Sequence, residues 1–233
     1  MFLKQRAAQA EYFDEPGRSP EAIAEDYRNL GRVNRFFHFA EPFQRLLPPI
    51  VGEAHCKDLT LLDLGGGDGS LGRALTTWAS ARGWTWQCTN LDICPHALRL
   101  NPQGRNVLGS VLSLPFPENS FDVVISAQMA HHLASESEVR LHFKEAYRVS
   151  RRALLLYDLH RSLALYLAIF ALMTVLPFPR RIRADGLLSV KKGWKVAEWK
   201  SLVETAGLPG AKVWADYHAR IMLQACKLSP ADP

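Results

Sequence analysis

The sequence predicts an α/β fold in which strands and helices alternate within one domain. Apolar runs of strand length alternate with helical segments along the chain, the pattern of a sheet covered by helices. The chain has 233 residues, 48% of them hydrophobic, which is enough for one domain with a sizeable core. One apolar run also ends at Leu64 and is followed by a glycine-rich turn. This pattern is typical of a buried strand whose carboxyl end lies at a ligand-binding site.

The first 50 residues predict a helical cap in front of a core that spans residues 51–233. Ser19 is a candidate N-cap and Pro20 suits the first helical position, so the cap is expected to begin there. Pro48 and Pro49 are expected to end its helical pattern.

The turn within residues 61–72 is the most informative stretch of the chain. Gly65, Gly67 and Gly69 lack a Cβ, so the backbone can take unusual φ values and approach a ligand closely. Asp63 is expected at the lip of the cleft, where a helix beginning near Ser70 points its amide groups and the positive end of its dipole. The turn therefore predicts a nucleoside site.

The glycine spacing favours one kind of nucleoside. A dinucleotide site needs a third glycine where Ser70 stands, so that pattern fits poorly. The string from Asp63 to Gly69 instead resembles the first motif of class I S-adenosylmethionine-dependent methyltransferases, an acid followed by G-x-G-x-G. The resemblance implies that the cofactor contacts Asp63, Gly65, Gly66, Gly67 and Gly69.

A second acid follows at the spacing this ligand requires. Residues 85–91 read as a strand that ends at Asp92, 23 positions after Gly69 (92 − 69). Such an acid is placed to accept both ribose hydroxyl groups, and Ile93 follows it. Asp92 can equally serve as a helix N-cap, because Pro95 can open the next helix.

The segment of residues 109–125 resembles the family segment that joins the third strand to the fourth. The resemblance implies that Ser110 and Val111 lie near the adenine. Similar chains usually carry an acid where Ser110 stands, and a hydroxyl is a weaker acceptor than a carboxylate, so cofactor affinity is expected to be lower.

The resemblance extends over about residues 55 to 160 and implies the whole fold. We expect a Rossmann-like, seven-stranded, mostly parallel sheet with an antiparallel last strand, an N-terminal helical cap, and a helical insertion at residues 160–193 after strand 5. Residues 211–217 and 219–227 are the two final strands in this scheme. The implied cofactor is S-adenosylmethionine, with S-adenosylhomocysteine as the product.

Candidate proton acceptors follow the fourth and fifth strands. His131 and His132 leave the fourth strand, and histidine titrates near neutrality, so either is a candidate general base, with His131 preferred. Asp158 and His160 follow the fifth strand as a competing pair. In each case a capping role for the following helix is the alternative. Gln128 and Met129 are expected near the transferred methyl group.

Candidate substrate contacts are drawn from the cap, the fourth strand and the insertion. In similar methyltransferases extra N-terminal helices cover the active site, which implies contacts from aromatic cap residues; the alternative is that these residues only staple the cap to the core. Arg161 can instead tie down a loop. The candidates are Tyr27, Phe36, Phe37, Met129, Arg161 and Tyr166.

The insertion contains a helix that is apolar on every face, at residues 163–176. Such a helix must be buried by something, yet its 14 residues (176 − 163 + 1) reach only about 20 Å, short of the ~30 Å bilayer core. Three interpretations stay open: a lid over an apolar pocket, a homodimer interface, or contact with a membrane surface through residues 163–195. Six bases favour the last, because they attract anionic headgroups: Arg180, Arg181, Arg183, Lys191, Lys192 and Lys195.

The resemblance points to the quinone and secondary-metabolite branch, whose members methylate oxygen or carbon of lipophilic small molecules of aromatic, quinone or polyketide type. We expect no nucleic-acid partner, because no stacking platform is visible, and no metal. Four scattered cysteines and the lack of a leader predict a cytoplasmic or membrane-peripheral protein. A non-catalytic scaffold of the same fold is the alternative, and an RNA methyltransferase is less favoured.

Overall fold

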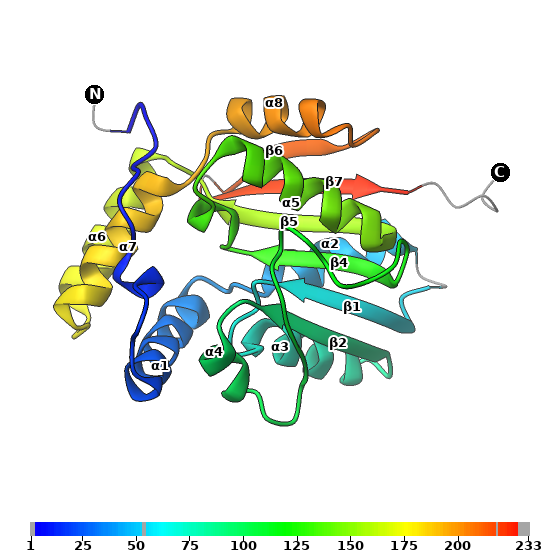
Figure 1. Ribbon diagram of the computed structural model, residues 1–233, viewed down its shortest axis with the longest axis horizontal. Helices are drawn as coiled ribbons and strands as arrows, with labels where there is room; N and C mark the ends of the chain where they lie inside the picture. The colour runs from blue at the N-terminus through cyan, green and yellow to red at the C-terminus, as the bar shows by residue number, and fades with distance from the viewer. Residues whose placement is uncertain (1–2, 53–54, 218, 228–233) are drawn as a thin grey trace.

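The computed structural model describes residues 3–52, 55–217 and 219–227, and it contains one seven-stranded sheet (Figure 1). The strands lie in the order β3-β2-β1-β4-β5-β7-β6, and β7 runs antiparallel to both its neighbours while the other pairs are parallel. The prediction of a mostly parallel sheet with an antiparallel last strand is confirmed. The strands are β1 (Asp58–Leu64), β2 (Thr85–Asp92), β3 (Arg105–Leu108), β4 (Phe121–Ala127), β5 (Ser150–Leu159), β6 (Lys212–Asp216) and β7 (Arg220–Cys226).

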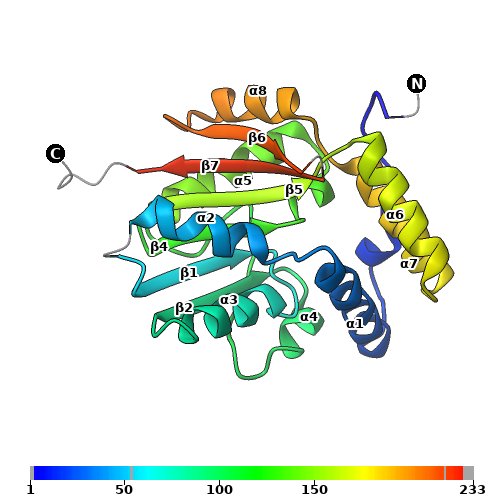
Figure 2. The same ribbon diagram turned by 180° about the vertical axis from the view of Figure 1, so that it is seen from behind.

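Helices cover both faces of this sheet. On one face α2 and α3 bury Phe43, Leu47 and Leu75 against the central strands (Figure 2). On the other face α5 and α8 meet through Phe143 and Trp199, whose ring centroids are 5.3 Å apart. The helices are α1 (Pro20–Phe36), α2 (Glu41–Val51), α3 (Ser70–Ser80), α4 (Pro95–Arg99), α5 (Glu136–Val149), α6 (Leu163–Val175), α7 (Arg180–Lys192) and α8 (Val196–Ala206), with short 3-10 turns η1 (Tyr12–Asp14) and η2 (Ala130–His132).

The central strands are apolar because both of their faces are covered. Leu61, Leu62 and Leu64 of β1 are fully buried, and the last of them delivers the chain to the glycine-rich turn. Since β1, β2, β4 and β5 are parallel, their carboxyl ends meet at one edge of the sheet. In both views α1, α6 and α7 lie beyond that edge (Figures 1 and 2).

The prediction of a single helical cap over residues 1–50 needs correction. The first helix, α1, does begin at Pro20, and the Ser19 side chain caps it by accepting a hydrogen bond from the amide of Ala22. The second helix, α2, packs on the sheet face and so belongs to the core, because its apolar side is buried there. It also continues to Val51, with Pro48 and Pro49 inside it. Residues 1–2 and 228–233, at the ends of the two predicted segments, lie outside the described residues.

The apolar helix of the insertion is half buried and half exposed. Its inner face, with Leu165, Ile169 and Met173, packs against α7. Its outer face exposes Leu167 and Phe170 by 55% and 51%. In the described part of the chain, no helix combines the length and apolarity needed to cross a bilayer.

Candidate active site

The glycine-rich turn between β1 and α3 is built around left-handed backbone. Gly65, Gly67 and Gly69 have φ values of 69°, 54° and 68°, a region that residues with a Cβ rarely adopt. Close packing adds a second reason, since a Cβ on Gly67 would lie 2.4 Å from the Tyr27 ring and one on Gly65 would lie 2.4 Å from Met129 Cγ. The amides of Gly65 and Gly66 donate to the carbonyl of Leu91, which fixes the turn against β2.

Asp92, at the end of β2, closes the second side of this turn. Its Oδ2 accepts a hydrogen bond from the amide of Gly67 at 2.8 Å, and its Oδ1 accepts one from Cys94 at 2.8 Å. The predicted helix N-cap role is thus only partly right: Asp92 holds the turn ahead of α4, whereas Cys94 is the N-cap residue. Burial raises the pKa of Asp92, and the two amide bonds partly oppose that rise.

Asp63 is the most perturbed acid beside the turn. It is 1% exposed, and its Oδ2 has no hydrogen-bond partner among the described residues. Desolvation, together with the charges of Asp92 and Asp68, raises its pKa to about 7. Three acids therefore crowd one wall, an arrangement that a positively charged ligand would relieve.

These residues line a cavity of about 1130 Å³ at the carboxyl edge of the sheet. Pockets for one small ligand usually measure roughly 300–1,000 Å³, so the cavity has room for a nucleoside and a second molecule. Seven of the predicted cofactor residues besides Asp63 and Asp92 lie on its wall: Gly65, Gly66, Gly67, Ile93, Ser110, Val111 and Gln128. Gly69 does not; its left-handed backbone forms the N-cap of α3, and its amide donates to Gly66.

The end of β4 lines the next part of the wall. Gln128 takes the left-handed φ of 55°, which is strained for a residue with a side chain. Its Nε2 donates to Asn34 of α1 at 3.2 Å and to the Tyr157 hydroxyl at 3.4 Å. Met129 packs over Gly65, so both predicted neighbours of the methyl group lie on the cavity wall.

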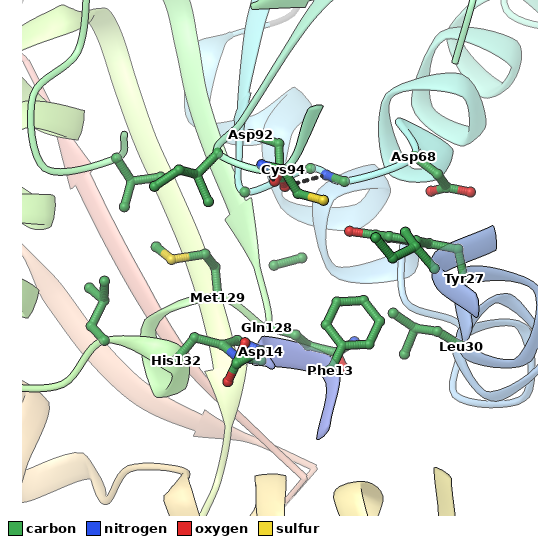
Figure 3. A pocket seen from close by; sticks show the side chains of 18 of the residues that line it. Phe13, Asp14, Tyr27, Leu30, Asp68, Asp92, Cys94, Gln128, Met129 and His132 are labelled. Atoms are coloured by element: carbon green, nitrogen blue, oxygen red, sulfur yellow. Dashed lines mark hydrogen bonds and ion pairs between the residues drawn. The ribbon is translucent and has the colours of Figure 1, made fainter. Parts of the chain in front are cut away.

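The roof of the cavity is formed by α1 and by residues 6–18, which we call the strap. Tyr27 of α1 reaches over Gly67, and Phe13 of the strap meets it edge to face with ring centroids 5.2 Å apart (Figure 3). Burial raises the pKa of Tyr27 well above its ordinary value, so its hydroxyl stays protonated. Leu30, on the same face of α1, also lines the roof.

His131 is paired with Asp158 beneath the cavity floor. Asp158 is fully buried; its Oδ1 lies 2.6 Å from His131 Nδ1, and its Oδ2 accepts the His131 amide at 2.7 Å. Burial alone would raise the pKa of Asp158, but the charge and hydrogen bond of His131 outweigh it, and the net pKa is lowered. His131 is 3% exposed and is not on the cavity wall. The predicted order of the two histidines is therefore reversed by accessibility.

His132 does line the cavity, and its partner comes from the strap. His132 Nδ1 lies 2.9 Å from Asp14 Oδ2. Burial lowers the pKa of His132, but the hydrogen bond to Asp14 and the charges of Glu11 and Asp14 outweigh it, and the net pKa is raised. Burial alone would raise the pKa of Asp14, but the hydrogen bond and charge of His132 outweigh it, and the pKa of Asp14 is lowered to about 2. Figure 3 shows the two side chains together on the wall opposite Asp92.

Five other predicted residues are absent from the described cavity lining. Phe36 is 60% exposed and meets Phe37 edge to face, and Phe37 packs toward α6. His160 forms a backbone bridge to Trp194, and Asp158 hydrogen-bonds to His131. The Arg161 guanidinium is buried against Glu198 and the carbonyl of Gly193, and it ties the chain down without reaching the cavity. Tyr166 lies on α6, which packs against α7 and contributes no described residue to the cavity lining, so the lid interpretation of that helix stays a prediction.

One group of described residues has the composition of a metal site. Ligand atoms of Glu11, His131 and His132 lie within 4.8 Å of one another. However, Lys192 Nζ lies 3.1 Å from Glu11 Oε1 and 3.3 Å from Asp14 Oδ2, so an ammonium group already supplies the local cation. We assign the group to hydrogen bonding, and the absence of a metal stays a prediction.

The described site fits a sulfonium nucleoside. The glycine turn leaves no room for added side chains, Asp92 retains free lone pairs for ribose hydroxyl groups, and the buried Asp63 oxygen lacks a partner. A mostly parallel sheet with an antiparallel β7 and a cavity at its carboxyl edge is the architecture of class I methyltransferases. Residues 62–156 match the family model described as a methyltransferase domain. Residues 62–156 thus form a methyltransferase domain, for which S-adenosylmethionine is the cofactor.

Solved structures share the fold. A putative S-adenosylmethionine-dependent methyltransferase from Methanococcus maripaludis has a TM-score of 0.67 and 16% identity, with 94% of this chain and 99% of that chain covered. One from Aquifex aeolicus has a TM-score of 0.60 and 16% identity, covering 90% and 98%. The plantazolicin methyltransferase BpumL, solved with a desmethylplantazolicin analogue and S-adenosylhomocysteine, has a TM-score of 0.66 and 11% identity, covering 89% of each chain. Among curated protein sequences, none matches this chain significantly.

Sequence reasoning missed the strap. Phe13, Asp14 and Lys192 lie on the cavity wall, and Glu11 lies just behind it. Nothing in the local pattern of residues 6–18 marks a site, because Asp14 meets its partner His132 across 118 positions of sequence. Two residues that only the tertiary fold brings together show no characteristic spacing in the sequence.

Proposed function

We propose that this enzyme methylates an acidic hydroxyl or carbon of a lipophilic small molecule of aromatic, quinone or polyketide type. The observation that carries the proposal is His132, a hydrogen-bonded imidazole on the wall of a cavity with room beside the nucleoside. The apolar side chains around it favour a lipophilic acceptor. They include Phe13, Leu30, Phe39, Leu112, Met129 and Leu133.

The chain has two tasks in this reaction. S-adenosylmethionine supplies a methyl group on a positively charged sulfur, which is already a strong electrophile. The cavity holds the acceptor in line with it, and such positioning removes roughly 7–11 kcal/mol of the barrier. His132 accepts the acceptor's O–H or C–H proton on Nε2; the new C–O or C–C bond takes the freed electron pair, and the carbon–sulfur bond electrons return to sulfur.

His132 is better suited to this task than its neighbour. With Nδ1 donating to Asp14, the neutral ring carries its lone pair on Nε2. His131 is buried between Asp158 and Glu11. Its Nδ1 contacts Asp158, and its Nε2 lies 3.7 Å from Glu11 Oε1, so both ring nitrogens face a carboxylate. We therefore assign His131 a structural role.

The test compares two glutamine variants on one probe series. With 4-alkylphenols of increasing chain length as acceptors, we expect S-adenosylhomocysteine formation to rise with chain length. His132→Gln should lower kcat by about 100-fold or more, because general base catalysis contributes roughly 10²–10⁴-fold. His131→Gln should lower thermal stability more than His132→Gln does. Equal activity of His132→Gln and the wild type would contradict the base assignment, and no dependence on chain length would contradict the lipophilic acceptor.

We propose in addition that the exposed face of α6 contacts an anionic membrane surface. Leu163, Leu167, Phe170 and Val175 leave an apolar stripe on this face, and Arg180 at the start of α7 is exposed beside its end. Two of the six bases are engaged elsewhere: Arg181 pairs with Glu25 and Asp26, and Lys192 with Glu11.

Vesicle flotation tests this contact. The wild type should float with phosphatidylglycerol vesicles and not with phosphatidylcholine vesicles, and Phe170→Glu should abolish flotation. A homodimer in sedimentation that Phe170→Glu dissociates, with no flotation, would show that the stripe is a subunit interface instead.

A further inference from the structure

The strap crosses the active site and is fastened mainly to α7. Asp185 of α7 accepts hydrogen bonds from the amides of Tyr12 and Phe13, both at 3.0 Å. Ser189 donates to Glu11 Oε2 at 2.8 Å, and the amide of Ala7 donates to the carbonyl of Lys191 at 3.1 Å. The insertion of residues 160–193 is therefore a platform for the strap, with α6 supporting α7 from behind.

The two ends of the strap are fixed as well. The Arg6 guanidinium stacks over Trp194, 3.5 Å from the ring centroid, and donates to the carbonyl of Lys192 at 2.9 Å. At the other end Arg18 pairs with the buried Asp26 of α1. The contacts of Arg6 and Arg18 therefore fix the position of η1 over the cavity.

This anchoring places Asp14 at one ring nitrogen of His132. The Asp14 oxygens lie 2.8 Å and 2.9 Å from Nδ1, and Lys192 Nζ lies 3.3 Å from Asp14 Oδ2. The Phe13 ring lies beside His132, with centroids 6.4 Å apart. A carboxylate on Nδ1 fixes the tautomer and the orientation of an imidazole, and so decides which nitrogen accepts a proton.

The field around His132 comes from several elements. The acids that face it are Glu11, Asp14, Asp92 and Asp158, and the basic groups are His131 and Lys192. Asp14 is the acid among them that hydrogen-bonds directly to the His132 ring. Replacing Asp14 therefore changes the hydrogen bond and the tautomer of the His132 ring. Loss of a more distant charge would change neither.

We propose that Asp14 is the positioning residue for the catalytic base, so that the strap which roofs the cavity also completes the active site. The inference rests on the proposed role of His132. On this proposal His132 is oriented only when the strap lies on α7. Closing the cavity over its ligands and orienting the base for proton removal are then one event.

The experiment observes the His132 ring in the full-length chain with S-adenosylhomocysteine bound. In ¹⁵N-histidine-labelled protein, His132 is assigned from the signal that disappears in His132→Gln, and its ring nitrogens are followed from pH 5 to pH 9. We expect the wild type to show protonated Nδ1 and a titration midpoint above that of free histidine. Asp14→Asn should lose the Nδ1–H signature and move the midpoint down.

Two matched variants separate this effect from general charge loss. Asp58→Asn makes the same change at an exposed residue on the amino edge of the sheet and should leave the His132 signals as in the wild type. Asp14→Glu should restore part of the signature. On a 4-alkylphenol probe, Asp14→Asn should lower kcat about tenfold and move the acidic limb of the pH–rate profile to lower pH.

The outcomes distinguish the two proposals. If Asp14→Asn leaves the tautomer and midpoint of His132 unchanged, the inference about the strap is overturned, whatever the activity of His132→Gln. If the His132 signals change as expected but His132→Gln keeps wild-type activity, Asp14 positions the ring and the assignment of His132 as the base is overturned.

Discussion

The two ends of the cavity are built in different ways. At the cofactor end, the turn after β1 and the carboxylate of Asp92 lie within 30 residues (63 to 92) and meet through local hydrogen bonds. At the acceptor end, Asp14, His132 and Lys192 come from three distant parts of the chain. The cofactor end is therefore built within one short stretch of sequence, whereas the proposed proton-accepting site depends on the packing of the strap and α7.

The largest expected effect concerns the cofactor end. Asp92→Ala should weaken S-adenosylhomocysteine binding by about 100-fold or more, because two ribose hydrogen bonds to a charged group, each roughly 1.5–3 kcal/mol, are lost. Isothermal titration calorimetry measures the change, with Asp58→Asn as the control. Unchanged affinity would contradict the ribose contact.

A pair of glycine variants separates backbone strain from crowding. Gly67 and Gly83 both have positive φ, 54° and 72°, but a Cβ on Gly83 would meet nothing within 4 Å whereas one on Gly67 would meet Tyr27. Gly83→Ala should cost roughly 1–2 kcal/mol of unfolding free energy. Gly67→Ala should cost about 1–3 kcal/mol more and weaken S-adenosylhomocysteine binding, as chemical denaturation and calorimetry measure. Equal costs would show that Tyr27 does not crowd the turn.

Asp63 gives cofactor binding a pH dependence. Its pKa of about 7 lies above the ordinary 3.8, so the folded chain holds an extra proton between these values, and the contribution of Asp63 to stability falls as pH rises through that range. A cationic ligand favours the ionised form, so affinity for S-adenosylmethionine should rise about tenfold from pH 6 to pH 8. Asp63→Asn should flatten the profile in calorimetry, and an equal slope in both proteins would exclude Asp63 as the cause.

The smallest expected effect concerns the acceptor end. Asp185→Asn replaces one of the two oxygens that accept from the amides of Tyr12 and Phe13 by an NH2 group, without touching the cavity. Hydrogen exchange of these amides should become several-fold faster, because one hydrogen bond is lost and the other is no longer charge-assisted. Exchange at Gly65 and Gly66 should stay as in the wild type. Unchanged exchange at residues 12 and 13 would show that α7 does not hold the strap.

Local patterns predicted the cofactor end well. The strand ending at Asp92, the helix beginning at Ser70 and the cap at Ser19 all appear where the sequence places them. Each depends on residues a few positions apart, so steric and capping preferences act directly on them.

Side-chain roles that depend on long-range packing were predicted less well. Asp158 pairs with His131, a partner that the sequence did not indicate, because β5 brings it beside η2. The composition of the apolar helix α6 predicted that it is buried and left a lid, a dimer interface and a membrane contact open, because composition does not say which partner buries a helix. The consecutive histidines have different surroundings because the η2 turn buries the ring of His131 and places the ring of His132 on the cavity wall.

The sequence by itself determined the alternation of strands and helices, the glycine turn and the acid that ends the next strand, since these are set by short-range backbone and burial preferences. Only the tertiary structure decided which histidine faces the cavity, which acid holds it and which segment forms the roof. The physical reason is that hydrogen bonds and ion pairs between Asp14, His132 and Lys192 exist only after α7 has docked beyond the sheet edge and fixed the strap.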